Sequence, residues 1–259
     1  MRKNLHTLAL LAAITFLFMS NAELYAASTD DRIEASAKQT YVFRTYLKND
    51  DIKVMSRSGD VSLTGTVAEE SHKALARDTV ASLPGVRAVD NKLSVKGATP
   101  AAGTDAWLIT KVKFALLFHN NVNASATKVY AKNGVVTLRG KATSTAQKDL
   151  TTEYAGDVDG VKSVKNEMTV PGSATKLSKA AAKIDAAGES IDDASTTALV
   201  KAALFYHRST SALNTNVETK DGIVTLSGKA KNAAEKDLAE KLVSDVHGVK
   251  KVVNNITVG

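Results

Sequence analysis

Apolar and polar residues alternate in three seven-residue segments that follow one pattern, Gly-x-Val-x-Leu-x-Gly. The segments occupy residues 59–65, 134–140 and 222–228. Such alternation predicts a β-strand that carries its valine and leucine on one face. The dipeptides Asn133-Gly134 and Asp221-Gly222 favour the positive φ angles of a type I′ turn, and Ser58-Gly59 is a weaker version. Each segment is therefore expected to be the second strand of a β-hairpin.

A second pattern, with apolar residues at helical spacing, flanks each hairpin. It is clearest before the hairpins, at residues 112–119 and 200–207. After them, helices are expected at the capping boxes Ser144-x-x-Gln147 and Asn232-x-x-Glu235. A Gly-Val pair follows 20 residues after each alternating segment, where a helix C-terminus favours a left-handed residue. Nine glycines thus define the repeat: Gly59, Gly65, Gly85, Gly134, Gly140, Gly160, Gly222, Gly228 and Gly248.

These patterns predict an α+β protein of three tandem αββαβ units, each a three-stranded mixed sheet packed by two helices. The last glycine of each alternating segment is expected to mark a bulge or the close approach of a helix. Unit one is expected at residues 31–97, unit two at 105–172 and unit three at 192–259. Residues 98–104 form a short linker, and the Ala-rich linker at 173–191 favours a weak helix over a coil. The arrangement of the units stays open.

The repeated unit resembles the BON domain (bacterial OsmY and nodulation). The resemblance rests on the alternating segment, the Gly-Val pair and a last strand that begins with Val-Lys-x-Val-x-Asn at residues 161–166 and 249–254. It covers nearly the whole chain after the N-terminal segment, and the tandem units resemble those of OsmY-like periplasmic proteins. The resemblance implies phospholipid association and maintenance of the envelope under osmotic stress, without catalysis.

Residues 1–26 have the features of a cleaved secretory signal peptide. Arg2 and Lys3 precede an apolar run at residues 8–19, which small residues follow. That run is shorter than the about 20 residues that span a bilayer. The chain has no cysteine, which excludes disulfides, thiolate metal sites and a lipid-modified cysteine. We therefore expect a soluble periplasmic protein.

The net charge of +7 favours anionic partners. Exported proteins rarely meet nucleic acid, so the expected partner is an anionic phospholipid surface, bound peripherally, and not nucleic acid. Unit two has the largest excess of positive charge, with nine basic and six acidic residues. Binding through about 1 kcal/mol per well-placed basic residue is expected to be weak and sensitive to salt.

Motifs for catalysis, cofactors or metals do not occur in the sequence, since the glycines are explained by turns and caps. We therefore expect no enzymatic activity, no cofactor and no metal. His119 and His207 occupy the same place at the end of the first helix of units two and three. There a histidine cation is expected to offset the helix dipole.

The first helix of unit two has two apolar stripes, although one sheet needs only one. The stripe expected to face the sheet consists of Leu108, Ile109, Val112 and Leu116. The second stripe, nearly opposite, consists of Trp107, Phe114 and Phe118, with Lys111 beside it. These four residues are the candidate lipid-binding site, because aromatic rings next to lysine suit the headgroup region. The alternative is that the second stripe packs against a neighbouring unit.

The leading hypothesis is therefore a non-enzymatic periplasmic protein that associates with anionic phospholipid. The alternative is a protein-interaction or chaperone module, which would engage exported or outer-membrane polypeptides through its apolar stripe and sheet edges. The lipid species, the client and the oligomeric state stay open at this point.

Overall fold

The computed structural model describes residues 29–97, 100–171, 191–210 and 215–259. The predicted signal peptide at 1–26 lies outside the described residues, and so do residues 98–99 of the first linker. The predicted second linker at 173–191 also lies outside them, except for its last residue.

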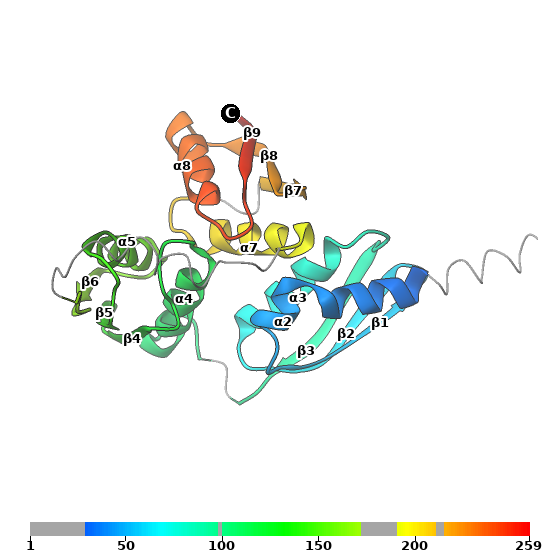
Figure 1. Ribbon diagram of the computed structural model, residues 1–259, viewed down its shortest axis with the longest axis horizontal. Coiled ribbons are helices and arrows are strands. Elements are labelled where there is room, and N and C mark those ends of the chain that lie inside the picture. The colour runs from blue at the N-terminus through cyan, green and yellow to red at the C-terminus, as the bar shows by residue number, and fades with distance from the viewer. Residues whose placement is uncertain (1–28, 98–99, 172–190, 211–214) are drawn as a thin grey trace, which may run out of the picture.

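Each unit has the order helix, two strands, helix, strand, and unit one has the additional short helix α2 before its hairpin (Figure 1). In unit one, residues 29–39 are helical, followed by α2 (Tyr41–Thr45), β1 (Asp51–Arg57), β2 (Asp60–Val67), α3 (Glu70–Ala81) and β3 (Ala88–Val95). Unit two consists of α4 (Asp105–Phe118), β4 (Thr127–Lys132), β5 (Val135–Gly140), α5 (Thr145–Gly156) and β6 (Ser163–Asn166). Unit three consists of α7 (Asp193–Tyr206), β7 (Thr215–Lys220), β8 (Ile223–Ala230), α8 (Ala233–Ser244) and β9 (Lys251–Val258).

The strands of each unit form one mixed sheet with the alternating segment in the middle. β1 pairs antiparallel with β2, and β3 pairs parallel with it; the other units repeat this topology. A parallel neighbour requires a crossover, which the helix after the hairpin provides. The predicted fold class, three tandem αββαβ units with mixed sheets, is confirmed.

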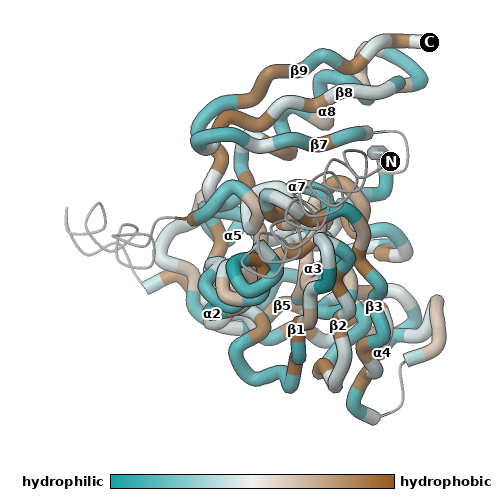
Figure 2. Tube along the Cα trace, turned by 90° about the vertical axis from the view of Figure 1, so that its right-hand side faces the viewer, coloured by the Kyte–Doolittle hydropathy of each residue, from teal (hydrophilic) through white to brown (hydrophobic). Residues whose placement is uncertain are grey.

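Side chains alternate between the two faces of each sheet, as the sequence pattern requires. Val136 and Leu138 of β5 are fully buried toward the helices, and Val224 and Leu226 take the same places in β8. Figure 2 shows polar and apolar residues succeeding one another along β8 and β9. The opposite face of each sheet, here called its open face, points away from the helices of its own unit.

The hairpin turns have the predicted positive φ angles at both central residues, 54° at Asn133 and 83° at Gly134. A carboxylate outside the predicted motifs binds this turn. Asp105, the first residue of α4, accepts the N–H of Asn133 at 2.8 Å and that of Gly134 at 3.0 Å. These bonds hold the pKa of Asp105 below its usual value. Asp30 and Asp193 make the same two bonds in units one and three.

The last glycine of the alternating segment marks a close approach, but of a neighbouring strand. At Gly140 φ is 137°, and a Cβ there would overlap the carbonyl oxygen of Ala126, just before β4. The predicted bulge or approach of a helix is therefore wrong, since the register of β1 and β2 runs without a bulge through the equivalent Gly65. In the same way, a Cβ at Gly65 would overlap the carbonyl oxygen of Asp51.

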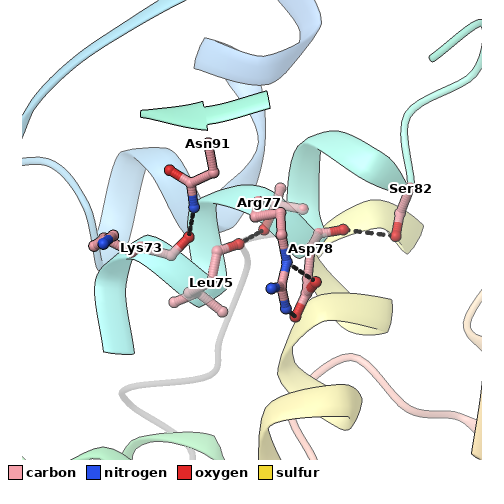
Figure 3. Close-up of polar contacts among 7 residues, drawn as sticks. Lys73, Leu75, Arg77, Asp78, Ser82 and Asn91 are labelled. Carbon is pink, nitrogen blue, oxygen red and sulfur yellow. Dashed lines mark hydrogen bonds and ion pairs between the residues drawn. The ribbon is translucent and has the colours of Figure 1, made fainter. Parts of the chain in front are cut away.

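All nine repeat glycines have positive φ. The glycine of each Gly-Val pair lies later than predicted, however, since α5 ends at Gly156 and Gly160 belongs to the turn that follows. The last strand is fixed to the preceding helix by an asparagine. In unit one the Asn91 amide donates to the carbonyl of Lys73 in α3 at 2.9 Å (Figure 3), and Asn166 and Asn254 do the same in the other units.

The predicted capping boxes are present in slightly altered form. The Ser144 hydroxyl accepts the N–H of Gln147 at 3.1 Å, and the Gln147 side chain accepts the N–H of Thr143 at 2.9 Å. The return bond thus reaches one residue before the N-cap. Asn232 and Glu235 make the equivalent bonds at α8.

Helix α7 of unit three lies at the centre of the molecule, between α3 of unit one and α4 of unit two (Figure 1). Ten of its 14 residues are buried, including Ser195 and Thr196, which are fully covered. Small side chains such as Ala198 and Ala202 allow helices to approach α7 from several sides. One apolar cluster therefore joins units one and three.

Units two and three pack against each other with near-twofold symmetry. His119 of unit two pairs by an antiparallel bridge with Val246, and its equivalent His207 pairs with Val158 of unit two. The flanking backbone hydrogen bonds are reciprocal as well. The N–H of Asn120 donates to the carbonyl of Asp245, and the equivalent N–H of Arg208 donates to that of Asp157. The N–H of His247 donates to the carbonyl of Phe118, and the equivalent N–H of Asp159 donates to that of Tyr206. A self-complementary contact of this kind is typical of a homodimer.

Candidate functional site

The structure divides the predicted lipid-binding residues into two pairs. Phe114 and Phe118 are buried, with 2% and 0% exposure, inside the cluster that joins units one and three. The Phe114 ring packs edge-to-face on Phe118 and on Tyr206 of α7, with centroids 4.5 and 5.1 Å apart. In this arrangement neither ring is accessible to a membrane, because these two residues of the second stripe pack between units. This is the alternative that the sequence left open.

Trp107 and Lys111 line a cleft of about 670 Å³ where the three units meet. Residues at the start of α3 and at the C-terminal end of α7 also line the cleft. Among them, Phe205 is 61% exposed. Three basic and three acidic side chains line it: Lys96, Lys111, Arg208, Glu69, Glu70 and Asp159. The formal charges that line the cleft therefore balance.

Lys111 is held within this cleft by three contacts, one with Trp107 and two with Asp159. Its ammonium group lies 4.0 Å from the centre of the Trp107 ring and 3.4 Å from a carboxylate oxygen of Asp159. It also donates to the Asp159 carbonyl at 3.2 Å. Burial lowers the pKa of Lys111, and Asp159 opposes that effect. A lysine engaged in this way has little freedom to meet a headgroup.

His119 does not act as the cation that the sequence predicted. It follows the last residue of α4 as expected, but it is buried, and its Nδ1 has no hydrogen-bond partner among the described residues. Burial lowers the pKa of His119 to about 4, so the imidazole is neutral at pH 7. The dipole interpretation is therefore wrong for His119. His207 lies 3.6 Å from the carboxylate of Asp157 across the two units.

A basic surface that the sequence patterns did not indicate lies on the open face of the unit-two sheet. Tyr130 is 46% exposed near its centre, and the Arg139 guanidinium carbon lies 5.4 Å from the ring centre. Glu167 accepts from Arg139 and Lys165, each at 2.7 Å. Five basic residues share this face with that single acid, a net charge of +4: Lys128, Lys132, Arg139, Lys141 and Lys165. We call it the basic face.

Equivalent positions in the other units carry less charge. The open face of unit one is neutral, with three basic and three acidic residues: Lys53, Arg57, Lys92, Asp51, Asp60 and Asp90. That of unit three has a net charge of +2, from Lys220, Lys229, Lys251 and Glu218. Because all three sheets have the same fold, folding does not require the charge of the basic face. Strand alternation and the repeat register could have located it in the sequence.

Within residues 29–97, 100–171, 191–210 and 215–259, no helix combines the length and hydrophobicity needed to cross a bilayer. The same described residues contain no group of three or more His, Cys, Asp or Glu side chains placed to hold a metal ion.

The repeated sheet-and-helix unit and its sequence pattern define the class of protein. The chain belongs to the BON domain family, whose family model matches residues 29–97, 104–172 and 192–259. Among individual proteins, the chain is similar to the osmotically-inducible protein Y of Escherichia coli. The two are 34% identical over 59% of this chain and 71% of that protein.

Two further relatives match a shorter part of the chain. A 21 kDa hemolysin of Actinobacillus pleuropneumoniae is 34% identical, and the outer membrane lipoprotein DolP of Haemophilus influenzae is 32% identical. Each match covers 44% of this chain and 59% of the relative. The chain thus spans less than two thirds of the length of these two proteins.

Proposed function

We propose that this protein associates peripherally with anionic phospholipid surfaces and helps to maintain the bacterial cell envelope under osmotic stress. It acts without catalysis, in the periplasm, after removal of the signal peptide. The names of two relatives support this proposal. An outer membrane lipoprotein supports a location in the envelope, and an osmotically-inducible protein supports a role under osmotic stress.

The observation that carries the proposal is the net charge of +4 on the basic face, against zero on the same face of unit one. The sheet presents all five basic side chains on one side, as contact with a bilayer surface requires. Each contributes about 1 kcal/mol near an anionic surface, so that several together produce reversible binding. Tyr130 adds an amphipathic ring of the kind found in the headgroup region.

This surface replaces the aromatic stripe of α4 as the proposed lipid contact. Phe114 and Phe118 are buried between units, and Lys111 is engaged by Asp159 and Trp107. The basic side chains of β4 and β5 are exposed, by contrast, and extend from a rigid element.

The test compares two triple variants of the full chain with equal loss of charge. The first replaces Lys128, Lys132 and Lys141 on the basic face by Gln. The second replaces Lys53, Arg57 and Lys92 on the open face of unit one in the same way. Binding is measured by cosedimentation with vesicles of phosphatidylcholine containing 30% phosphatidylglycerol at low salt, and with phosphatidylcholine alone.

The first variant is expected to bind anionic vesicles about 100-fold more weakly than the wild type, because it loses three surface charges. The second is expected to bind within about threefold of the wild type. Equal binding of the wild type to both kinds of vesicle would overturn the lipid function. Equal losses in the two variants would show that net charge, and not this face, produces the binding.

A further inference from the structure

The near-twofold symmetry of units two and three creates two equivalent grooves, one on each side of the pair. The first, here called the open groove, is the part of the cleft lined by Trp107, Lys111, Phe205 and Arg208. The second, here called the filled groove, has the equivalent residues Ser195, Leu199, Leu117 and Asn120. The two grooves therefore have the same backbone frame and different contents.

The filled groove contains α2, the short helix of unit one. The N–H of Tyr41 donates to the carboxylate of Asp192 at 2.7 Å, and that of Val42 donates to the Ser195 hydroxyl at 3.0 Å. The Tyr46 hydroxyl donates to the carbonyl of Leu117 at 3.1 Å. Val42 is fully buried in the same apolar cluster as Leu199. This groove thus binds one helical turn through an apolar anchor and polar contacts at the ends.

The open groove has no such occupant among the described residues. The cleft that contains it has a volume of about 670 Å³, within the range of about 300–1,000 Å³ that is usual for binding pockets. Phe205 is 61% exposed there, whereas its equivalent Leu117 is half-buried against the core. Aromatic side chains are common in the walls of binding pockets.

We propose that the open groove binds a short amphipathic helix of a partner polypeptide, in the manner in which the filled groove binds α2. The occupant inserts apolar side chains between Trp107 and Phe205. Since the charges lining the cleft balance, net charge does not select the occupant. This surface is distinct from the basic face, so the inference goes beyond the proposed lipid function.

The distribution of charge fits the dipole of a helix. Unit one lines the cleft with a net charge of −1, from Glu69, Glu70 and Lys96. Units two and three line it with a net charge of +1, from Lys111, Asp159 and Arg208. A helix is stabilised by anions near its N-terminus and by cations near its C-terminus. The docked helix is thus expected to point its N-terminus toward α3 and its C-terminus toward Arg208.

The test uses a fluorescein-labelled peptide of this chain's residues 38–50, which contain α2, and a scrambled peptide. Binding to the full chain is measured by fluorescence anisotropy. A second readout is acrylamide quenching of Trp107, the single tryptophan of the chain, since neither peptide contains tryptophan. Phe205→Ala removes the proposed anchor and Thr110→Tyr fills the groove. The control, Met55→Ala, truncates a side chain that is 49% exposed in unit one.

The peptide is expected to bind saturably, to protect Trp107 from acrylamide, and to bind at least fivefold more weakly to both groove variants than to the control. Binding that these variants do not change overturns the proposal, as does the absence of saturable binding. Protection of Trp107 by phosphatidylglycerol vesicles and not by peptide would make the occupant a lipid. Self-association of the chain that Phe205→Ala abolishes would make it a second copy; either result contradicts the proposed partner.

Discussion

The imidazole of His119 lies flat against the phenol ring of Tyr154, with ring centroids 3.6 Å apart and planes inclined by 1°. The Tyr154 hydroxyl donates to Asp245 of unit three at 2.8 Å, so the stack lies within the contact between units two and three. Four further groups act on His119: Asp245 and Asp157 favour its protonation, while His247 and His207 oppose it. Desolvation outweighs all of them and keeps the ring neutral.

The stability of the protein should therefore fall on mild acidification. The pKa of His119 is lowered to about 4, against about 6.5 in the unfolded chain, so the unfolded chain binds the proton more tightly. The free energy of unfolding is highest above pH 6.5 and decreases by about 3 kcal/mol in all as the pH falls toward 4. Urea unfolding at pH 7.5 and pH 5 measures the first part of this loss, about 2 kcal/mol.

His119→Phe keeps a flat ring against Tyr154 and removes the titration. This variant should reduce the difference between pH 7.5 and pH 5 by at least half. Some dependence should persist, because burial also lowers the pKa of His247. A variant with the full dependence of the wild type would show that His119 is not its source.

A second prediction concerns the aromatic side chains between the units. Phe118 is fully buried, whereas Phe205 is 61% exposed, so the same truncation to alanine tests burial alone. Phe118→Ala should lower the free energy of unfolding by about 3–5 kcal/mol, and Phe205→Ala by less than about 1 kcal/mol. Urea denaturation of the full chain measures both. Similar values for the two variants would contradict the packing of α4 between units.

A third prediction compares two glycines of unit two. Gly134→Ala introduces a Cβ at a φ of 83°, where the nearest atoms belong to the flexible Lys162 side chain, and should cost about 1 kcal/mol. Gly140→Ala introduces one against the backbone carbonyl of Ala126, which cannot move without disturbing the hairpin. Its cost should be at least twice as large. Thermal unfolding distinguishes the two, and an equal or reversed order would argue against the close approach at Gly140.

The sequence predicted the fold well because its signals are local. Strand alternation, the turn dipeptide Asn133-Gly134 and the Gly-Val spacing each restrict a few consecutive residues, and the threefold repeat tests them against one another. Asp105 was missed although its signal was present. It precedes the turn residue Asn133 by 28 residues, as Asp30 precedes Ser58 and Asp193 precedes Asp221.

The candidate site was harder to predict, because it depends on contacts between units. An apolar stripe containing Phe114 and Phe118 fits a membrane and a neighbouring unit equally well, since both remove the rings from water. The neutral state of His119 likewise depends on burial by residues far away in the sequence, such as Val246. The basic face could have been located from alternation alone, because the position of each side chain on a strand is fixed by its register.

The near-twofold contact between units two and three limits how this chain can associate with itself. A self-complementary surface has a valency of one, because it binds a single copy of itself. In this chain the surfaces of units two and three already occupy each other. Unit one is joined through different residues, with α3 against α7. Tandem copies of a module can thus accumulate in one chain without growing into a filament, because the paired units close on themselves.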